Sequence, residues 1–308
     1  MIQDKEGRSK FKKIFSALEL PMDCNEALDY ASLSNLIDYE LSIGVEGFYC
    51  MGSSGEALLL STDERKKALE CIIHSVDGRV PVIAHVGTIR TADVIELGRH
   101  AASYGIDAIS MIPPYYYKFS MDEITAYYEE VMQAVPDIPV IIYNIPQFTG
   151  IEFSKDNASR LLDNPRVLGV KHTSKDLYSL ERMSANYPDR IFFNGFDEQF
   201  LAALSMGADA TIGTTVNILA PLFIRIRNLY EHGRMKEALS VQQELNYCVE
   251  EMCKVGIFNA VKYILNIRGI ETAGCRKPFH TLTQEEKSQL DCVVKQYDAY
   301  LRQLSQKN

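Results

Sequence analysis

The sequence predicts an α/β fold, a TIM (β/α)8 barrel followed by a C-terminal helical extension. Short apolar runs alternate with longer amphipathic stretches from the start of the chain to about residue 230, and eight of these runs have the length of a strand. Beyond residue 230 the apolar residues recur only at helical spacing. We therefore expect a barrel in residues 1–230 and a helical extension packed on it in residues 231–308.

The eight candidate strands are the short apolar runs of the barrel segment. They lie near residues 13–19, 45–51, 80–86, 107–112, 138–143, 167–171, 191–194 and 208–213. Segments between them, such as TDERKKALECIIHSV, have one apolar face, which is typical of surface helices. A doubly wound sheet is the structural alternative, but no GxGxxG motif follows the first strand.

Capping residues indicate where two of the helices begin and end. Thr62 precedes DERKKALE and Thr91 precedes ADVIELG, so we expect both threonines to be N-caps. Gly105 follows the second of these segments and is a residue type that commonly stops a helix.

Composition excludes several classes of protein. The chain has 308 residues and a net charge of -9, from 32 basic and 41 acidic side chains, which argues against a nucleic-acid-binding surface. No apolar run approaches the length of about 20 residues that spans a bilayer. The 7 cysteines show no CxxC spacing and the 6 histidines no metal-ligand spacing. We expect a cytoplasmic protein that binds no metal, nucleic acid or membrane.

Two polar residues end neighbouring apolar strands in the middle of the chain. Tyr143 ends IPVIIY and Lys171 ends VLGVK, and they are 171 − 143 = 28 residues apart, about one strand, helix and return. Adjacent parallel strands deliver both side chains to the same end of the sheet. Burial would lower the pKa of the lysine and free its amine for attack on a ketone, with the phenol carrying protons. Alternatively, Lys171 turns to solvent and Tyr143 is a core aromatic.

The strand that carries Lys171 also predicts which residues lie beside it. Alternation places Gly169, Lys171 and Thr173 on one face, with Val170 and His172 on the other. If Lys171 points into the barrel, Gly169 leaves space beneath its stem and Thr173 offers a hydroxyl above it.

Loops after other strands carry further candidate groups. In MGSSGEA, Ser53 and Ser54 lie between glycines, so exposed N–H groups and hydroxyls could bind a carboxylate or phosphate, although a plain loop is an alternative. In FNGFDEQF, Asp197 and Glu198 could accept hydrogen bonds from a polyhydroxyl substrate or simply favour the start of the next helix.

Two more loops allow both a functional and a structural interpretation. IGTTVN supplies Gly213 and Thr214, which are either ligand donors or helix punctuation. IPPYYYKF supplies Tyr115, Tyr116 and Tyr117, an aromatic cluster that suits an active-site wall or a subunit contact.

Taken together, these motifs resemble the dihydrodipicolinate synthase/N-acetylneuraminate lyase family of class I pyruvate-dependent aldolases. GSSGEA, IPPYYY, YNIP with TG shortly after, GVKHTSKD, NGFDE, IGTTVN and CRKPF occur in the order seen in that family, from about Phe15 to the end of the chain. GSSGE marks the superfamily. NGFDE and CRKPF are more specific to its sialic-acid lyase branch.

The resemblance implies a homotetrameric aldolase that cleaves N-acetylneuraminate reversibly to pyruvate and N-acetylmannosamine without a metal or cofactor. It implies that Lys171 forms a Schiff base with the keto carbon of pyruvate and that Tyr143, assisted by Tyr117, shuttles the proton. Ser53 and Ser54 would hold the pyruvate carboxylate. The residues implied to bind the rest of the substrate are Thr173, Gly195, Asp197, Glu198, Gly213 and Thr214.

Departures from the family pattern bear on the choice of substrate. Dihydrodipicolinate synthase has an arginine shortly after YNxP, where this chain has Gln147 and Phe148, so lysine biosynthesis is disfavoured. Leu20 replaces a threonine and Lys175 a glycine of the usual motifs. The rival interpretations are a 2-keto-3-deoxy sugar acid aldolase of the same family and a non-catalytic sensor of pyruvate or sialic acid.

Overall fold

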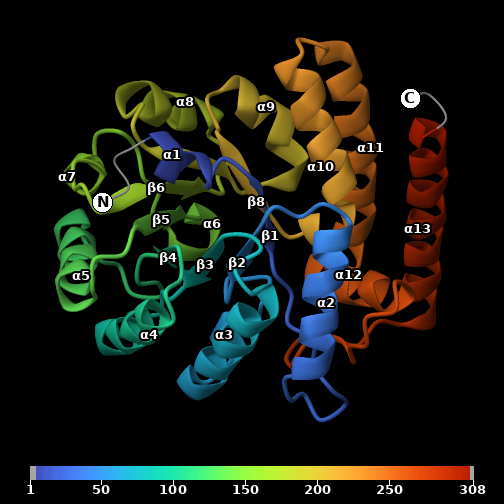
Figure 1. Cartoon of the computed structure of the whole chain (residues 1–308), viewed down its shortest axis with the longest axis horizontal. Coiled ribbons are helices and arrows are strands. Elements are labelled where there is room, and N and C mark those ends of the chain that lie inside the picture. Colours follow the sequence, from blue (N-terminus) through green and yellow to red (C-terminus); the bar gives the residue numbers. More distant parts are fainter. Residues whose placement is uncertain (1–4, 306–308) are drawn as a thin grey trace.

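A closed barrel of parallel strands forms the centre of the chain in this computed structural model, which describes residues 5–305 (Figure 1). The strands pair in sequence order, and β8 closes on β1. They are β1 (Ile14–Ala17), β2 (Gly47–Cys50), β3 (Val82–His85), β4 (Ala108–Met111), β5 (Val140–Asn144), β6 (Val167–His172), β7 (Ile191–Asn194) and β8 (Ala210–Gly213). The TIM barrel and all eight predicted strands are confirmed.

Helices surround the barrel, and three more follow the last of them. Around the barrel lie α2 (Tyr30–Ser42), α3 (Thr62–Val76), α4 (Thr91–Ser103), α5 (Met121–Ala134), α7 (Ser159–Leu162), α8 (Leu177–Asn186), α9 (Phe200–Ser205) and α10 (Val216–Glu231). Short turns of helix are α1 (Lys5–Ser9), α6 (Pro146–Thr149), η1 (Ala57–Leu59) and η2 (Asp197–Gln199). The C-terminal helices are α11 (Met235–Lys254), α12 (Ile257–Ile267) and α13 (Gln284–Ser305). In Figure 1, α11 lies beside α10, and α13 stands at the edge of the molecule beyond it.

The strands separate two apolar cores because their side chains alternate between the inside and the outside of the barrel. Phe15, Tyr49, Ile83, Ile141 and Phe193 belong to the inner core and are fully buried. The outer core lies between the strands and the surrounding helices. Each barrel strand therefore reads as a continuous apolar run in the sequence rather than as an alternation, as expected for strands covered on both faces.

A register shift in the β5–β6 pair sets the position of the predicted site. The shift falls between Val140 and Ile141 of β5, and beyond it Tyr143 lies opposite Lys171. A Cβ atom on Gly169 would lie 1.8 Å from the carbonyl oxygen of Ile191, so only glycine fits there. Gly169 thus allows close approach of β7, rather than opening space beneath the lysine stem as the alternation predicted.

The predicted N-caps are wrong by one residue. Ser61, not Thr62, caps α3: its hydroxyl accepts from the backbone N–H of Glu64, whose carboxylate accepts from the N–H of Ser61. Arg90 precedes α4 without a side-chain cap, so Thr91 is already inside that helix. In both cases a threonine at the first helical position follows the actual cap residue, and the sequence pattern does not separate the two positions.

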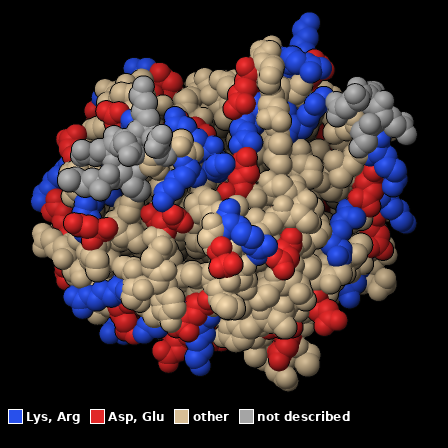
Figure 2. All heavy atoms as spheres, viewed as in Figure 1, with Lys and Arg blue, Asp and Glu red and all other residues tan. Residues whose placement is uncertain are grey.

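Surface charge is mixed. Figure 2 shows basic and acidic side chains interspersed over one face, with neither sign forming a broad patch. Two lysines just before β1 pair with aspartates, Lys10 with Asp107 at 2.7 Å and Lys12 with Asp209 at 2.6 Å. Within residues 5–305, no helix combines the length and the apolar character that a membrane crossing requires.

A glutamate on α2 is buried in the outer layer and makes stability depend on pH. Glu40 is fully buried, and burial raises the pKa of its carboxyl to about 8. Because the folded-state pKa exceeds the ordinary value of 4.5, the folded chain holds a proton that the unfolded chain releases. The stabilising contribution is present at low pH and is lost as pH rises from about 4.5 to about 8.

We expect Glu40→Gln to become increasingly stabilising relative to the wild type as pH rises. Between pH 5 and pH 8.5 the difference in unfolding free energy should grow by an amount on the order of 4 kcal/mol, because the variant has no carboxyl to ionise. Urea denaturation at several pH values measures it, with Glu130→Gln, an exposed glutamate on α5, as control. A difference that does not change with pH would contradict the assignment of a raised pKa.

Candidate active site

A buried amine lies at the carboxyl end of the barrel. Lys171, on β6, is 4% exposed, and its Nζ lies 4.1 Å from the ring centroids of both Tyr49 and Tyr143. Burial lowers the pKa of Lys171, while the charges of Tyr143 and Asp197 oppose the shift. The lysine thus points into the barrel, as predicted, and the alternative of a solvent-exposed strand-end lysine is wrong.

The residues that follow Tyr143 and Lys171 fasten the two strand ends together. Asn144 lies opposite His172, and its Nδ2 donates to Nδ1 of the histidine at 3.0 Å. His172 Nε2 donates to the carbonyl oxygen of Asp176 at 3.0 Å. Both ring nitrogens are therefore engaged, and burial lowers the pKa of His172. This histidine supports the backbone behind the amine and has no free nitrogen for proton transfer.

Tyr49 forms the second aromatic wall beside the amine. It is fully buried on β2, and its hydroxyl donates to Ser110 Oγ at 3.0 Å, which donates in turn to the carbonyl oxygen of Ile141 at 3.2 Å. Its ring meets that of Tyr143 edge to face, with centroids 6.0 Å apart. No feature of the sequence distinguished Tyr49, as a site residue, from the other core aromatics. The signal that could have found it is its inward position on a barrel strand.

The loop predicted to bind an anion has both of its ends in the left-handed region. Met51 has φ 56° and Glu56 has φ 51°. The carbonyl oxygen of Met51 accepts from His85 Nδ1 at 3.0 Å, and His85 Nε2 accepts from the N–H of Ile112 at 3.2 Å. His85 therefore supports the loop structurally. The sequence did not indicate this role, because the histidines show no informative spacing.

Within the loop, the two predicted serines have different surroundings. Ser54 is buried and its Oγ lies 2.8 Å from Oγ1 of Thr214, the residue after β8. Ser53 is partly exposed and lines a cavity at the mouth of the barrel. The structure therefore brings the loop after β2 and the loop after β8 together, as a common anion site would require.

Two oxygens of the predicted pocket are buried without a partner. Thr173 Oγ1 and Asp197 Oδ1 are both inaccessible, and neither has a hydrogen-bond partner within residues 5–305. A Cβ atom on Gly195 would lie 1.8 Å from Thr173 Oγ1, and one on Gly213 would lie 1.9 Å from Asp197 Oδ1. Each oxygen is thus seated against the backbone of a neighbouring strand end. Buried unsatisfied oxygens are costly, and a bound ligand can satisfy them.

Asp197 is held from the other side by two groups. Its Oδ2 accepts from the backbone N–H and from the hydroxyl of Thr215, both at 2.8 Å, and its carbonyl oxygen accepts from Gln242 Nε2 at 3.2 Å. Burial raises the pKa of Asp197 to about 6, against the two Thr215 hydrogen bonds. Gln242 lies on α11, and the sequence pattern did not indicate its role.

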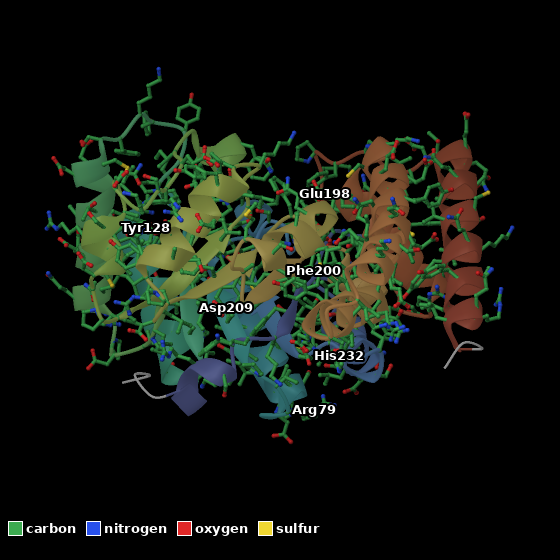
Figure 3. The ribbon with its side chains drawn as sticks, turned by 90° about the horizontal axis from the view of Figure 1, so that it is seen from above. Arg79, Tyr128, Glu198, Phe200, Asp209 and His232 are labelled. Carbon is green, nitrogen blue, oxygen red and sulfur yellow. The ribbon has the colours of Figure 1, made fainter. Side chains whose placement is uncertain are left out.

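Glu198 differs from its neighbour Asp197 in exposure. Asp197 is 6% exposed, whereas Glu198 is an exposed residue of η2. In Figure 3, Glu198 lies towards one end of the barrel, and Asp209, Arg79 and His232 lie towards the other. Although Asp197 and Glu198 are adjacent in sequence, one carboxylate is buried and the other is exposed to solvent.

A cavity of about 530 Å³ opens beside Ser53 and His85. Its wall is mostly apolar, and it includes Gly52, Glu56, Ala57, Leu58, Leu59, Ile112, Tyr115, Gln147, Phe148, Phe258, Pro278 and Phe279. Of the tyrosine cluster, Tyr115 lines this cavity. Tyr117 is 63% exposed and packs against Tyr116 and Phe119 instead.

Two further cavities, of about 370 and 520 Å³, lie at the opposite end of the barrel. They share Pro165, Asp189 and Arg190. Arg190 donates to the carbonyl oxygens of Leu162 and Asn164, so its guanidinium supports the backbone. TIM barrels place their chemistry at the carboxyl ends of the strands, and these cavities are at the amino ends. Among the residues that the structure describes, no group of His, Cys, Asp or Glu could hold a metal ion.

Comparison with known proteins places this site in context. Residues 10–297 match the model of the dihydrodipicolinate synthetase family. The N-acetylneuraminate lyase of Rhizobium meliloti is 39% identical over 97% of this chain and 99% of its own length. A catalytic-lysine mutant of Ruminococcus gnavus sialic acid aldolase superposes with a TM-score of 0.92 at 31% identity, covering 96% and 98% of the two chains. Fusobacterium nucleatum N-acetylneuraminate lyase complexed with pyruvate superposes with a TM-score of 0.89 at 33% sequence identity. The match covers 94% of this chain and 98% of that one.

We expect Gly213→Ala to destabilise the fold by about 1–3 kcal/mol, because the added methyl overlaps Asp197 Oδ1. Guanidinium denaturation measures the loss. The double variant Gly213→Ala/Asp197→Ala removes the overlapping oxygen and should recover part of it. Additive losses in the double variant would show that the close approach to Asp197 is not the cause.

Proposed function

Because this chain belongs to the dihydrodipicolinate synthetase family, we propose that it is a Schiff-base aldolase that cleaves N-acetylneuraminate reversibly to pyruvate and N-acetylmannosamine. The observation that carries this function is the buried amine of Lys171 opposite Tyr143 in the β5–β6 register. An amine with a lowered pKa and a phenol beside it are the two groups that Schiff-base chemistry on a ketone requires.

Lys171 acts as the nucleophile in this proposal. Its unprotonated Nζ attacks the keto carbon of the open-chain sugar acid. The keto oxygen then leaves as water with a proton supplied by the Tyr143 phenol, which gives a protonated imine and a Tyr143 phenolate. The two aromatic rings of Tyr49 and Tyr143 exclude water from the amine without supplying a full opposite charge. Lys171 therefore loses its proton more readily than an exposed lysine does.

Tyr143 transfers the proton in the cleavage step. As the phenolate left by imine formation, it takes the proton from the C4 hydroxyl while the C3–C4 bond breaks, and the bonding electrons move into the imine to give the enamine of pyruvate. The C4 fragment leaves as the aldehyde of N-acetylmannosamine. Protonation of the enamine at C3 and addition of water to the imine then release pyruvate and free Lys171. The imine is itself the electron sink.

The remaining predicted residues divide between the two halves of the substrate. Ser53 and Ser54 bind the carboxylate through the loop after β2, supported by the Ser54–Thr214 contact of 2.8 Å. Thr173 and Asp197 offer the substrate their unpartnered oxygens. These assignments follow from the need of buried oxygens for partners, which hydroxyl and amide groups of a sugar can supply. Glu198, Gly195 and Gly213 complete this wall of the pocket.

The wall beyond Tyr143 argues against a substrate with a second carboxylate. Gln147 and Phe148 line the cavity at the position where a dihydrodipicolinate synthase carries its arginine. A neutral amide and an aromatic ring cannot form the bidentate ion pair that an arginine gives to a carboxylate. Specificity for the neutral tail of a sugar acid fits these two residues better.

We propose that the chain forms a homotetramer in the cytoplasm. Whether Tyr117 assists Tyr143 in proton transfer depends on how the subunits of this tetramer meet. Tyr116 and Tyr117 are 86% and 63% exposed on one loop, and exposed aromatic clusters are typical of subunit contacts. Since Tyr117 does not line the cavity of its own chain, a catalytic role would require it to reach the cavity of a neighbouring chain.

We expect Lys171→Ala to lose cleavage activity on the order of 10⁴-fold or more with its fold intact, because no other described amine reaches the site. Pyruvate release from N-acetylneuraminate, beside 2-keto-3-deoxygluconate, measures both activity and substrate choice. Lys236→Ala, at an exposed lysine on α11, is the control. Undiminished turnover by Lys171→Ala would remove the nucleophile assignment, and preference for the second substrate would move the enzyme to another branch of the family.

A second expectation concerns pH. Below about pH 6 Asp197 is protonated and loses an acceptor for substrate hydroxyls, so kcat/KM for N-acetylneuraminate should fall as pH is lowered through about 6. Thr215→Val removes a hydrogen bond that favours the carboxylate, so the pKa of Asp197 and the inflection should both move to higher pH. Steady-state pH profiles measure this, and an inflection that Thr215→Val leaves in place belongs to another group.

A further inference from the structure

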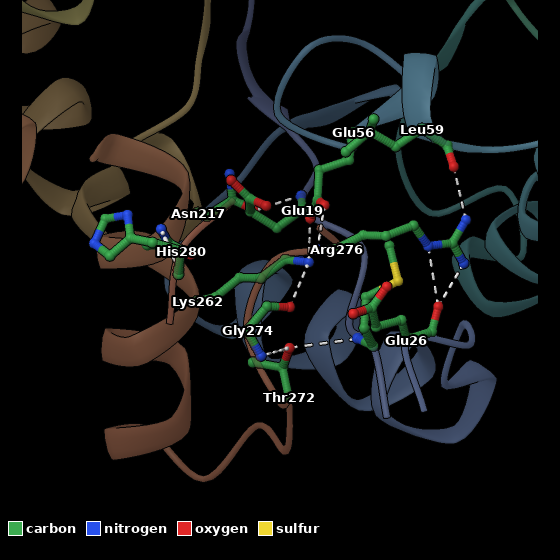
Figure 4. Close-up of polar contacts among 12 residues, drawn as sticks. Glu19, Glu26, Glu56, Leu59, Asn217, Lys262, Thr272, Gly274, Arg276 and His280 are labelled. Atoms are coloured by element: carbon green, nitrogen blue, oxygen red, sulfur yellow. Dashed lines mark hydrogen bonds and ion pairs between the residues drawn. The ribbon is translucent and has the colours of Figure 1, made fainter. Parts of the chain in front are cut away.

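A buried ion pair joins the C-terminal extension to the carboxylate-binding loop. Lys262 of α12 forms a hydrogen-bonded ion pair with Glu56, and their side chains are 1% and 0% exposed. Lys262 Nζ also donates to the carbonyl oxygen of Gly274 at 3.1 Å. Figure 4 shows Lys262 reaching from its helix towards both partners. The proposed mechanism has no use for these two side chains. Glu56 belongs to the cavity wall, whereas Lys262 does not line the cavity.

The CRKPF motif, whose physical role the sequence left open, supplies a second connection to the same glutamate. The backbone N–H of Arg276 donates to Glu56 Oε2 at 2.7 Å. Its guanidinium donates to the carbonyl oxygen of Leu59 at 2.8 Å and pairs with Glu64 at 2.7 Å. The Arg276 hydrogen bond holds the pKa of Glu64 at about 2. Arg276 therefore links Glu56, η1 and the start of α3 to one another. Figure 4 shows its guanidinium beside the carbonyl oxygen of Leu59.

Glu56 needs such an anchor because its backbone is unusual. It is a non-glycine residue with φ 51° and ψ 31°, at the point where the loop enters η1. Its N–H closes a turn onto the carbonyl oxygen of Ser53 at 3.1 Å. A residue held in the left-handed region costs about 1–3 kcal/mol and persists where its surroundings fix it. The anchored carboxylate supplies that fixation at the end of the loop opposite His85.

A third acid nearby does not compete for the lysine. Glu19 is fully buried near Lys262, and neither of its carboxyl oxygens has a hydrogen-bond partner in the described part of the chain. Burial raises the pKa of Glu19 well above its usual range, and the charge of Lys262 opposes that shift. Lys262 forms its ion pair with Glu56, and removal of either partner strands a charge in the interior.

We propose that Glu56, Lys262 and Arg276 are positioning residues that hold the loop of residues 51–56 in the conformation that binds the substrate carboxylate. The inference rests on the proposed function, since it takes Ser53 and Ser54 as the groups that meet that carboxylate. It assigns Arg276 of the CRKPF motif and Lys262 of α12 a part in substrate recognition, although neither of these two residues lines the cavity. The three residues touch the loop and not the reacting atoms.

This role predicts a selective defect. Loosening the loop weakens binding of a ketone that carries a carboxylate, whereas a ketone without one loses nothing because it makes no contact there. Lys171 reacts with both kinds of ketone, and borohydride reduction traps the resulting imine. Comparing trapping with pyruvate and with acetone therefore distinguishes a displaced loop, which weakens only pyruvate binding, from a change in the reactivity of Lys171, which affects both ketones. The comparison needs no sugar substrate.

The test compares Lys262→Met, Glu56→Gln and the double variant Lys262→Met/Glu56→Gln. Mass spectrometry of the Lys171 adduct gives the apparent affinity for each ketone. We expect each variant to bind pyruvate about tenfold more weakly, the scale of one weakened charge-assisted hydrogen bond, with acetone trapping unchanged. The double variant leaves no stranded charge and keeps an acceptor for Arg276 N–H, so it is the variant expected to fold best.

The matched control breaks a different ion pair of the extension. Arg268, the residue that follows α12, pairs with Asp298 of α13 at 2.6 Å, away from the loop, and Arg268→Met should leave trapping with both ketones at the wild-type level. Equal losses with pyruvate and acetone, or no loss with either in the double variant, would overturn the positioning role. If wild-type protein traps pyruvate but releases none from N-acetylneuraminate, the proposed substrate fails and the loop inference stands.

Discussion

Lys171 presents a reactive amine only because its surroundings exclude water and supply little opposing charge. The rings of Tyr49 and Tyr143 lie 4.1 Å from its Nζ, and burial lowers the pKa of the amine against the opposing charges of Tyr143 and Asp197. A fully ionised carboxylate in direct contact would hold the ammonium form. The inner core of the barrel therefore stabilises the fold and also provides the apolar environment that favours the neutral amine.

Around the amine, several polar groups are held against the backbone of neighbouring strand ends and loops. The hydroxyl of Thr173 and the carboxylate of Asp197 each rest against a glycine at the end of a neighbouring strand, at separations that leave no room for a Cβ. His85 is likewise held by main-chain partners through both ring nitrogens, and His172 through its Nε2. Such supports leave side-chain oxygens free for a substrate while restricting their motion.

The features found from sequence were those with a local signature. A strand is a short apolar run, and Tyr143 and Lys171 stand out because each ends such a run, so the barrel and the pairing of these residues could be predicted. Tyr49 has the same local pattern as any core aromatic. Gln242 meets Asp197 across 45 positions, and Lys262 meets Glu56 across 206, so no spacing indicates either contact. The one-residue error at Ser61 arose because two adjacent residues are both good caps.

The pairing of Glu56 with Lys262 also bears on how the chain reaches its working form. The two residues are 206 positions apart, and the glutamate is fully enclosed only when α12 has packed behind it. During synthesis from the N-terminus, the barrel strands can assemble while this carboxylate still faces water, since burial of an unpaired charge is strongly unfavourable. Substrate recognition would then mature last, after the final quarter of the polypeptide has emerged and docked. A nascent or truncated chain would have the barrel's shape before it had the enzyme's selectivity.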